Sequence, residues 1–206
     1  GIGKSTLIDI IMGLLQPSKG VFAIDDIPIT IDNNRDWQSH IAHVPQSIFL
    51  SDASIEENIA FGVNENDIDD KKLKKFINFS KLSETVNSLP EKENTKVGER
   101  GIKLSGGQQQ RLGIARALYT NPKVIIFDEA TNALDVLTEN EILNSLDELG
   151  KDITIVMIAH RLEIMRRFDK IIFLNNGKLD GFGSFEELVQ NNVNFKNLVE
   201  VNKPNG

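Results

Sequence analysis

The feature that most constrains the fold is a run of four large apolar residues at positions 124–127, which ends in two acids, Asp128 and Glu129. An uninterrupted apolar run of strand length is typical of a strand buried on both faces, as in parallel sheets that helices cover on each side. Further apolar runs alternate with helical stretches, at residues 21–25, 27–31, 41–45, 153–159 and 170–174. Asn176 with Gly177 predicts a type I′ hairpin turn after the last run, and Ser184 with Glu187 predicts a capping box at the start of the next helix. We therefore expect an α/β fold with a largely parallel sheet, in which residues 124–128 form a central strand.

The first six residues are of the types that hold phosphate: Gly1, Ile2, Gly3, Lys4, Ser5 and Thr6. They match the last part of the pattern G-x-x-x-x-G-K-[ST]. In this pattern glycine N–H groups surround phosphate oxygens, the lysine reaches the β- and γ-phosphates, and the hydroxyl ligates Mg²⁺. A helix is expected to follow over residues 5–15. Taken alone, the string could also be the chance start of a glycine-rich helix.

The two acids after the central strand suit a metal-dependent hydrolysis. Ligands of open α/β sheets bind at the carboxyl ends of the strands, so Asp128 is expected to hold Mg²⁺ through its water shell. Glu129 lies one residue further, where a general base would polarise an attacking water. A solvated acidic turn is the alternative, but the phosphate-binding string favours the catalytic interpretation.

A second candidate anion site lies at Ser105, Gly106, Gly107 and Gln108, just before a helix expected over residues 109–118. A hydroxyl and two glycines at this point place free N–H groups at the positive end of that helix. The chain therefore contains two phosphate-directed sites, far apart in sequence.

Composition argues against several other functions. Lysine plus arginine is 23 and aspartate plus glutamate is 30, which gives a net charge of −7. This acidic balance argues against a general nucleic-acid binder. The absence of cysteine excludes a disulfide scaffold, thiol catalysis and cysteine-ligated metal sites. No apolar run approaches the roughly 20 residues of a membrane helix.

Together these motifs resemble the nucleotide-binding domain of an ATP-binding-cassette (ABC) protein, over essentially the whole chain. They are a Walker A remnant at 1–6, a glutamine loop at 43–46, the signature at 104–108, Walker B at 124–129, a D-loop at 133–135 and a switch-histidine region at 158–161. The resemblance implies a P-loop NTPase fold. Its RecA-like core would comprise residues 1–52 and, with the C-terminal helices, 120–206, and a helical signature subdomain would comprise residues 53–119.

The resemblance also implies roles that the residues alone do not give. Gln46 would contact Mg²⁺ and water and sense the γ-phosphate of ATP, and His160 would hydrogen-bond that phosphate. Ser5, Gln46 and Asp128 would hold Mg²⁺. Residues 105–108 would close over ATP bound by a second copy, in a head-to-tail homodimer. Without the resemblance, Gln46 and His160 would be ordinary polar residues at strand ends.

Two stretches resemble exporters in particular. Residues 47–62 are similar to the segment that receives a coupling helix of the membrane domain, and residues 95–101 to the loop that touches the partner transmembrane subunit. Ordinary subdomain packing is the alternative for both. The implied protein is an ATPase motor that exports lipid, lipid-linked sugar, peptide or drug. Its transmembrane domain would lie upstream on the same chain, and this domain at the cytoplasmic face of the plasma (inner) membrane.

Other interpretations of the resemblance are a non-transport ABC ATPase, of the DNA-repair, chromosome-structure or ribosome-associated type, and a catalytically inactive regulatory cassette. No nucleic-acid partner is expected. Because the chain starts at Gly1 without an initiator Met, we interpret it as a piece of a longer protein. A parallel sheet that lacks a central strand exposes apolar surface, so we expect this segment alone to fold poorly or to bind ATP weakly.

Overall fold

The computed structural model describes residues 3–148 and 153–202. The chain forms two compact units, one of residues 31–157 and one of residues 1–30 together with 158–206. Within the described residues, no helix has both the length and the apolar character needed to cross a bilayer.

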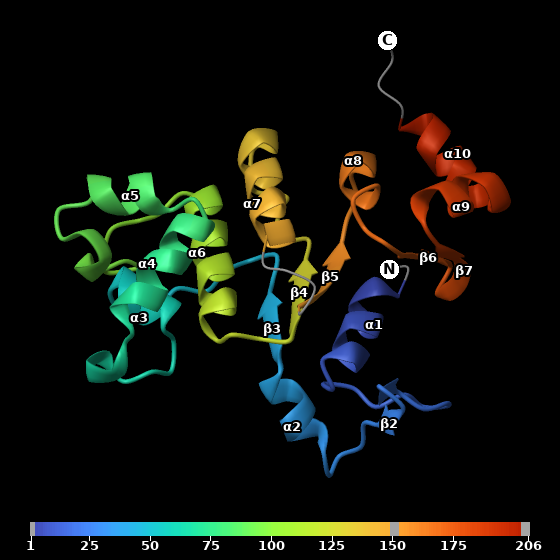
Figure 1. Ribbon diagram of the computed structural model, residues 1–206, viewed down its shortest axis with the longest axis horizontal. Coiled ribbons are helices and arrows are strands. Elements are labelled where there is room, and N and C mark those ends of the chain that lie inside the picture. Colours follow the sequence, from blue (N-terminus) through green and yellow to red (C-terminus); the bar gives the residue numbers. More distant parts are fainter. Residues whose placement is uncertain (1–2, 149–152, 203–206) are drawn as a thin grey trace. The chain divides into compact units, whose positions relative to one another are not determined.

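The unit of residues 31–157 combines a three-stranded sheet with helices (Figure 1). Its strands are β3 (Ile41–Val44), β4 (Val124–Asp128) and β5 (Thr154–Ile158). Its α-helices are α2 (Asn34–Ser39), α3 (Ile55–Ile59), α4 (Asp70–Phe79), α5 (Ser83–Ser88), α6 (Gly106–Tyr119) and α7 (Val136–Glu148). Two short 3₁₀ turns, η1 (Glu65–Asp67) and η2 (Lys92–Asn94), lie between them.

Strand β4 is the middle strand of this sheet, with β3 and β5 as its neighbours. It pairs in parallel with β3, so that Val44 lies opposite Phe127. The side chains of Ile125, Ile126 and Phe127 are fully buried, as expected of a parallel strand covered on both faces. The prediction of a central, buried strand at this position is confirmed.

Helices α3 to α6 lie between β3 and β4 in the chain, and α3 and α4 pack against α6 (Figure 1). Helix α6 contacts α3 and α4 and also strand β3. Its Leu112, Ile114 and Leu118 side chains are fully buried. The longest helix of this group therefore joins the helical segment to the sheet.

The other unit contains α1 (Lys4–Ile11), β1 (Ala23–Ile24), β2 (Ile27–Pro28), α8 (Leu162–Met165), β6 (Ile171–Asn175), β7 (Lys178–Gly183), α9 (Phe185–Asn191) and α10 (Val193–Val201). Strands β6 and β7 form an antiparallel hairpin. Asn176 and Gly177 at its turn both have positive φ angles, as the predicted type I′ turn requires. The rings of Phe173 and Phe185 pack edge-on against Phe195, with centroids 5.2 and 5.4 Å away.

Several predicted boundaries were wrong by a few residues. The helix expected over 5–15 is α1, which ends at Ile11 because the chain turns at Gly13 with φ +69°. The strands expected over 21–25 and 27–31 shrink to two residues each, joined through Asp25 and Asp26 in left-handed conformation. Local turn chemistry, invisible to hydrophobic periodicity, ends these elements early.

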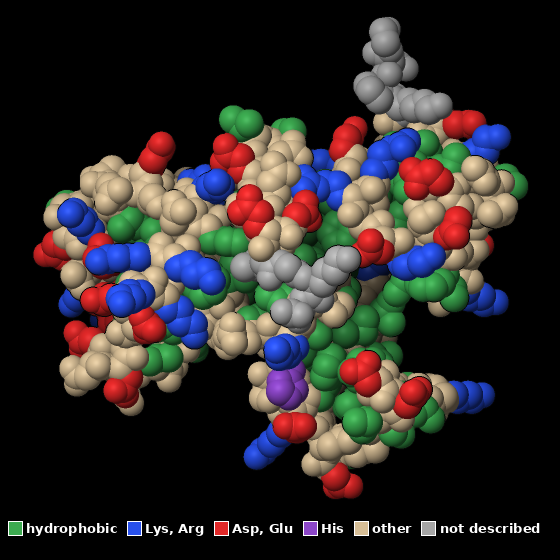
Figure 2. Space-filling model, viewed as in Figure 1, with side chains coloured by type: hydrophobic (Ala, Val, Ile, Leu, Met, Phe, Trp, Pro, Cys, Tyr) green, Lys and Arg blue, Asp and Glu red, His purple; other side chains and the backbone are tan. Residues whose placement is uncertain are grey.

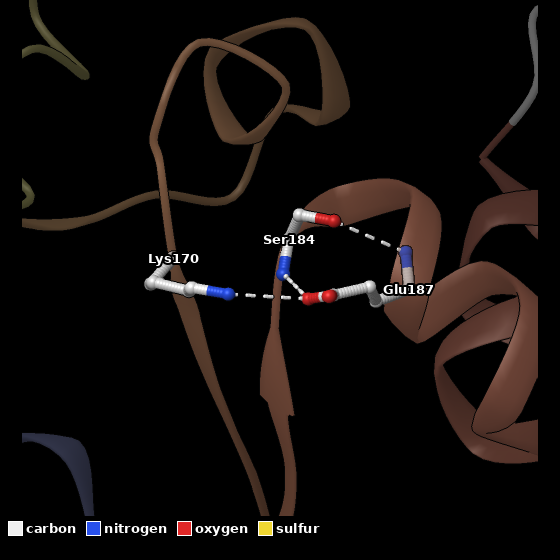
Figure 3. Close-up of polar contacts among 3 residues, drawn as sticks. All are labelled: Lys170, Ser184 and Glu187. Atoms are coloured by element: carbon white, nitrogen blue, oxygen red, sulfur yellow. Dashed lines mark hydrogen bonds and ion pairs between the residues drawn. The ribbon is translucent and has the colours of Figure 1, made fainter.

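A capping box starts α9, as the sequence predicts (Figure 3). The Ser184 hydroxyl accepts from the Glu187 N–H at 3.2 Å, and the Glu187 carboxylate accepts from the Ser184 N–H at 2.7 Å. The Lys170 ammonium donates to the same carboxylate at 3.3 Å. The bond from the Ser184 N–H is the main reason that the pKa of Glu187 lies below its usual value, and the bond from Lys170 lowers this pKa further.

This lowered pKa makes the start of α9 sensitive to acid. The bonded carboxylate stabilises the helix above the ordinary glutamate pKa, and the stabilisation is lost as the pH falls through the lowered pKa. We expect the protection of α9 amides, relative to their intrinsic exchange rates, to fall in the intact protein as the pH drops through the lowered pKa of Glu187. Glu187→Gln, which keeps an acceptor for the cap, should remove this pH dependence. Glu200→Gln, at an exposed position of α10, should keep it, and equal acid sensitivity in both variants would contradict the assignment.

Candidate functional site

The N-terminus of α1 has the backbone features of an anion site. Gly3 precedes the helix with φ +89°, a left-handed conformation that strains other residues. Lys4 is the first residue of the helix, and Ser5 and Thr6 follow with exposed side chains. The N–H groups of a first helical turn have no partner within the helix and attract negative charge. Three side chains and the helix end can therefore meet an anion here.

Lys4 and His160 come together although 156 positions separate them in the sequence. The Nζ atom of Lys4 lies 3.1 Å from Nε2 of His160. A lysine ammonium can only donate, so this ring nitrogen is the acceptor. The structure thus brings a predicted phosphate-binding cation beside the predicted sensor of the γ-phosphate. Gly1 and Ile2, also predicted to bind phosphate, lie outside the described residues.

Gln46, Asp128 and Glu129 emerge at one edge of the three-stranded sheet. Because β3 and β4 run in parallel with Val44 opposite Phe127, the residues after both strands leave at the same side. The Gln46 side chain is exposed, whereas Asp128 and Glu129 are half-buried. The structure therefore gathers three of the predicted metal and catalytic residues at the carboxyl edge, where ligands of such sheets bind.

Glu129 has an unusual backbone for a residue with a side chain, with φ +53°. Asn132 Nδ2 donates to its carboxylate at 3.3 Å, and the Asn132 N–H donates to its carbonyl at 3.2 Å. Strained backbone of this kind clusters at functional sites, where surrounding contacts hold it. No sequence motif predicts a role for Asn132, and the structure makes it a partner of the predicted general base.

Gln110 is a second residue that sequence reasoning missed. Its Nε2 donates to the Gln46 carbonyl at 2.6 Å, and its side chain is only 3% exposed. It therefore ties the loop that carries Gln46 to helix α6. A signal existed in the sequence, because positions 110, 114 and 118 share one face of a helix, and the apolar Ile114 and Leu118 indicate that this face is buried.

The signature residues are predicted to precede a helix. In the structure they instead cap this helix and form its first turn. Helix α6 begins at Gly106 instead of position 109, with Ser105 as the residue that caps it. The Ser105 Oγ accepts from the Gln108 N–H at 3.3 Å, and Gln108 Oε1 accepts from the Ser105 N–H at 2.8 Å. The chain can start the helix this early because a serine followed three residues later by glutamine completes a capping box.

This capping box affects what each signature residue can do. Ser105 uses an oxygen lone pair in the cap, so its O–H remains a donor. The N–H groups of the first helical turn have no acceptor within the helix, and a Cβ added at Gly106 would meet nothing within 4 Å. The amide oxygen of Gln108, in contrast, already accepts a hydrogen bond from the Ser105 N–H. Gln108 is predicted to bind nucleotide, and in the structure its amide oxygen holds the turn in shape.

Asp135 begins helix α7 in the same way. Its carboxylate accepts from the N–H and the hydroxyl of Thr138 at 2.9 and 2.7 Å. The bond from the Thr138 N–H is the main reason that the pKa of Asp135 lies below its usual value, and the bond from the Thr138 hydroxyl lowers this pKa further. The segment predicted as a D-loop is thus fixed by its own helix cap, with Leu134 beside it buried.

The lysine-rich helix α4 shows no purely basic surface on the face in Figure 2, where basic and acidic side chains alternate over the region of α4 and α5. Two of its lysines lie against aromatic rings: Lys72 Nζ is 4.6 Å from the centroid of Tyr119, and Lys75 Nζ is 5.3 Å from that of Phe76. The aliphatic stems of these lysines therefore cover apolar surface while their charges reach solvent.

The parallel sheet with acids at its carboxyl edge and the glycine-led helix α1 define a P-loop NTPase fold. The chain belongs to the ABC transporter family, whose family model matches residues 1–132. It is 40% identical over 189 residues to the "Multidrug resistance ABC transporter ATP-binding and permease protein" of Lactococcus lactis subsp. lactis (strain IL1403), covering 92% of this chain and 32% of that protein. It is 37% identical over 202 residues to the "ATP-dependent lipid A-core flippase" of Cupriavidus pinatubonensis (strain JMP 134 / LMG 1197), covering 98% of this chain and 34% of that protein.

A solved structure of a bacterial Atm1-family ABC exporter with ATP bound has the same fold. The TM-score is 0.91 at 32% sequence identity, and the match covers 100% of this chain and 36% of that one. The chain thus spans about a third of the length of these relatives. The predicted fold class and family are confirmed.

The capping box of α6 can be tested apart from any ligand. Gln108→Leu removes the acceptor for the Ser105 N–H and should destabilise the first turn of α6 by about 1 kcal/mol, the usual worth of a helix cap. Gln108→Glu restores an acceptor of the same reach and should keep the stability. Amide exchange at residues 107–109 of the intact protein measures both. Equal protection in wild type and Gln108→Leu would contradict this role.

Proposed function

We propose that this chain is the ATP-hydrolysing motor domain of an ABC exporter. The observation that carries the proposal is the contact between Lys4 and His160 at the N-terminus of α1, 3.1 Å between Nζ and Nε2. Phosphate binding explains why a cation and an imidazole meet at a helix end that already attracts anions. The names of the relatives support the proposal, since they describe ATP-binding and permease proteins and an exporter with ATP bound.

ATP would bind through the first helical turn. Gly1, Ile2, Gly3, Ser5 and Thr6 would contribute backbone N–H groups and hydroxyls, and the Lys4 ammonium would reach the β- and γ-phosphates. His160 would exchange Lys4 for the γ-phosphate as its hydrogen-bond partner. The contact with His160 would keep the Lys4 ammonium at the N-terminus of α1.

Mg²⁺ would be held by Ser5, Gln46 and Asp128. Hydroxyl, amide and carboxylate oxygens are the hard ligands that this ion takes in proteins. Among residues 3–148 and 153–202, no cluster of three or more His, Cys, Asp or Glu could hold a metal. This fits an ion bound through one or two carboxylates and the substrate phosphates. When bound, Mg²⁺ neutralises charge on the β- and γ-oxygens.

Glu129 would act as the general base. Its half-buried carboxylate lies at the carboxyl edge of the sheet and is held by Asn132. There it would accept a hydrogen bond from the attacking water and align it with the γ-phosphorus. Gln46, at the same edge, would register whether the γ-phosphate is present.

A second copy of the chain would complete the site in a head-to-tail homodimer. Ser105 offers a free O–H, and Gly106 and Gly107 offer N–H groups at the first turn of α6, in a turn that Gln108 keeps in shape. We propose that these donors bind the γ-phosphate held by the other copy. ATP would then join the two copies, and hydrolysis would release them.

The membrane domain would precede this domain on the same chain, since the relatives' names describe ATP-binding and permease activities in one protein of about three times this length. The motor would lie at the cytoplasmic face of the plasma (inner) membrane. Its core would comprise residues 1–52 and 120–206 and its helical subdomain residues 53–119. The exported compound would be a lipid, lipid-linked sugar, peptide or drug.

Glu129→Gln tests the general base. The amide keeps the shape of the side chain but cannot take a proton, so ATP turnover by the full-length protein should fall by about a hundredfold or more. ATP binding should persist, and the variant should accumulate as an ATP-bound dimer in size-exclusion chromatography. Unchanged turnover would contradict the role, and Glu141→Gln on the exposed face of α7 controls for loss of a charge.

Mixed dimers test the head-to-tail arrangement. Lys4→Ala should disable nucleotide binding, and Ser105→Arg should disable the signature, so each full-length variant alone should be inactive. When both are co-expressed, a mixed dimer contains one site built from the intact Lys4 of one copy and the intact Ser105 of the other. Single-turnover ATP hydrolysis should therefore return in purified mixed dimers. If the signature served the ATP of its own copy, mixing would restore nothing.

A further inference from the structure

Arg116 of helix α6 binds the segment of residues 49–61 with its whole guanidinium group. Its Nε donates to the Asn58 carbonyl at 2.7 Å, one terminal nitrogen to the Phe49 carbonyl at 2.9 Å, and the other to Asn58 Oδ1 at 3.1 Å. Its Cζ also lies 5.4 Å from the centroid of the Phe61 ring. A single side chain thus contacts both ends and the middle of this segment.

Asn58 extends the network through the segment itself. It is fully buried, and its Oδ1 accepts from the N–H and the hydroxyl of Ser51 at 3.0 and 3.1 Å. Its Nδ2 donates to the carbonyls of Ser51 and Ser54 at 3.1 and 2.9 Å. Every polar atom of the Asn58 side chain is therefore bonded, and a fully satisfied buried network is rigid.

The network depends on the geometry of the guanidinium. Burial lowers the pKa of Arg116, and among residues 3–148 and 153–202 no carboxylate forms an ion pair with it. The guanidinium instead donates three hydrogen bonds, in three fixed directions, to two carbonyl oxygens and one amide oxygen. A lysine carries the same charge but cannot reach acceptors spread in this planar pattern.

Helix α6 holds the same stretch of chain at two other points. One is the bond from Gln110 to the Gln46 carbonyl at 2.6 Å. The other is a close approach at Gly113, where an added Cβ would overlap the side chain of Ile48. The helix that begins with Ser105 therefore fixes the chain from the Gln46 loop to Phe61 at successive turns.

The segment that Arg116 holds carries exposed aromatic side chains. Phe49 is 75% exposed and Phe61 is 60% exposed, although Arg116 contacts the carbonyl of the first and the ring of the second. Both belong to residues 47–62, the stretch that resembles the segment receiving a coupling helix of the membrane domain in exporters. A partner seated on these rings would press directly on groups that Arg116 links to α6.

We propose that Arg116 is a positioning residue that makes this docking segment and the signature turn move as one body, so that a membrane-domain helix seated on Phe49 and Phe61 follows Ser105. The proposal rests on the proposed function and adds to it the residue that transmits the motion. Arg116 touches neither nucleotide nor metal in this scheme. It acts through α6, whose first turn bears the signature.

The test separates nucleotide binding from its effect on the membrane domain. Full-length protein carrying Glu129→Gln, reconstituted in lipid vesicles, is titrated with ATP. Binding is measured by displacement of a fluorescent ATP analogue, and the shape of the membrane domain by its protection from trypsin. With Arg116→Met or Arg116→Lys added, we expect the dissociation constant to change by less than about twofold. The fraction of the membrane domain that is protected at saturating ATP should fall about fivefold.

Arg111→Met is the matched control, because Arg111 lies on the same helix and, within the described part of the chain, no hydrogen bond joins it to residues 46–61. It should leave the protection curve of the membrane domain unchanged. Unchanged protection at saturating ATP in both Arg116 variants would overturn the proposal, as would a loss of ATP binding that accounts for the whole decrease. Absence of ATP-dependent protection in the protein without these changes would instead contradict the proposed function.

A milder pair of variants serves if the Arg116 variants do not fold. Phe61→Leu removes the ring from Arg116, whereas Phe49→Leu keeps the carbonyl that Arg116 binds, and both positions are exposed. Both changes reduce the docking surface, so we expect Phe61→Leu to lower the protected fraction at saturating ATP about threefold further than Phe49→Leu. Equal decreases would overturn the role of Arg116.

Discussion

The parallel pairing of β3 with β4 is the constraint on which the candidate site depends. Because Val44 lies opposite Phe127, the chain leaves both strands at the same edge, and Gln46 is brought to Asp128 and Glu129. The pairing is maintained by burial: three successive residues of β4 have no exposed surface, so a slip of register would open the core to water. The positions of the acids thus follow from the packing of the strand that precedes them.

Much of this arrangement could be predicted from residue types at fixed spacing. The apolar run ending in two acids identified the central strand, Asn176 with Gly177 identified a hairpin turn, and Ser184 with Glu187 identified a helix cap. Each of these signals is local, because the residues that create the structure are neighbours in the sequence. The family followed from the order of such local motifs.

What could not be predicted depends on partners far apart in the chain. Arg116 looks like a surface residue by type, and only its place among buried positions of α6 hints that its charge needs acceptors. Its acceptors, at Phe49 and Asn58, are 67 and 58 residues away. The early start of α6 was missed for a different reason, because glycine is a poor helix former by propensity and the capping box overrides that preference.

The contact of Lys4 with His160 has a further consequence on the proposed function. A ring nitrogen that accepts a hydrogen bond from an ammonium carries no proton, and it must carry one to donate to a phosphate oxygen. The exchange of partners therefore requires Nε2 to change from acceptor to donor. Nucleotide binding would in this way select the tautomer of one imidazole.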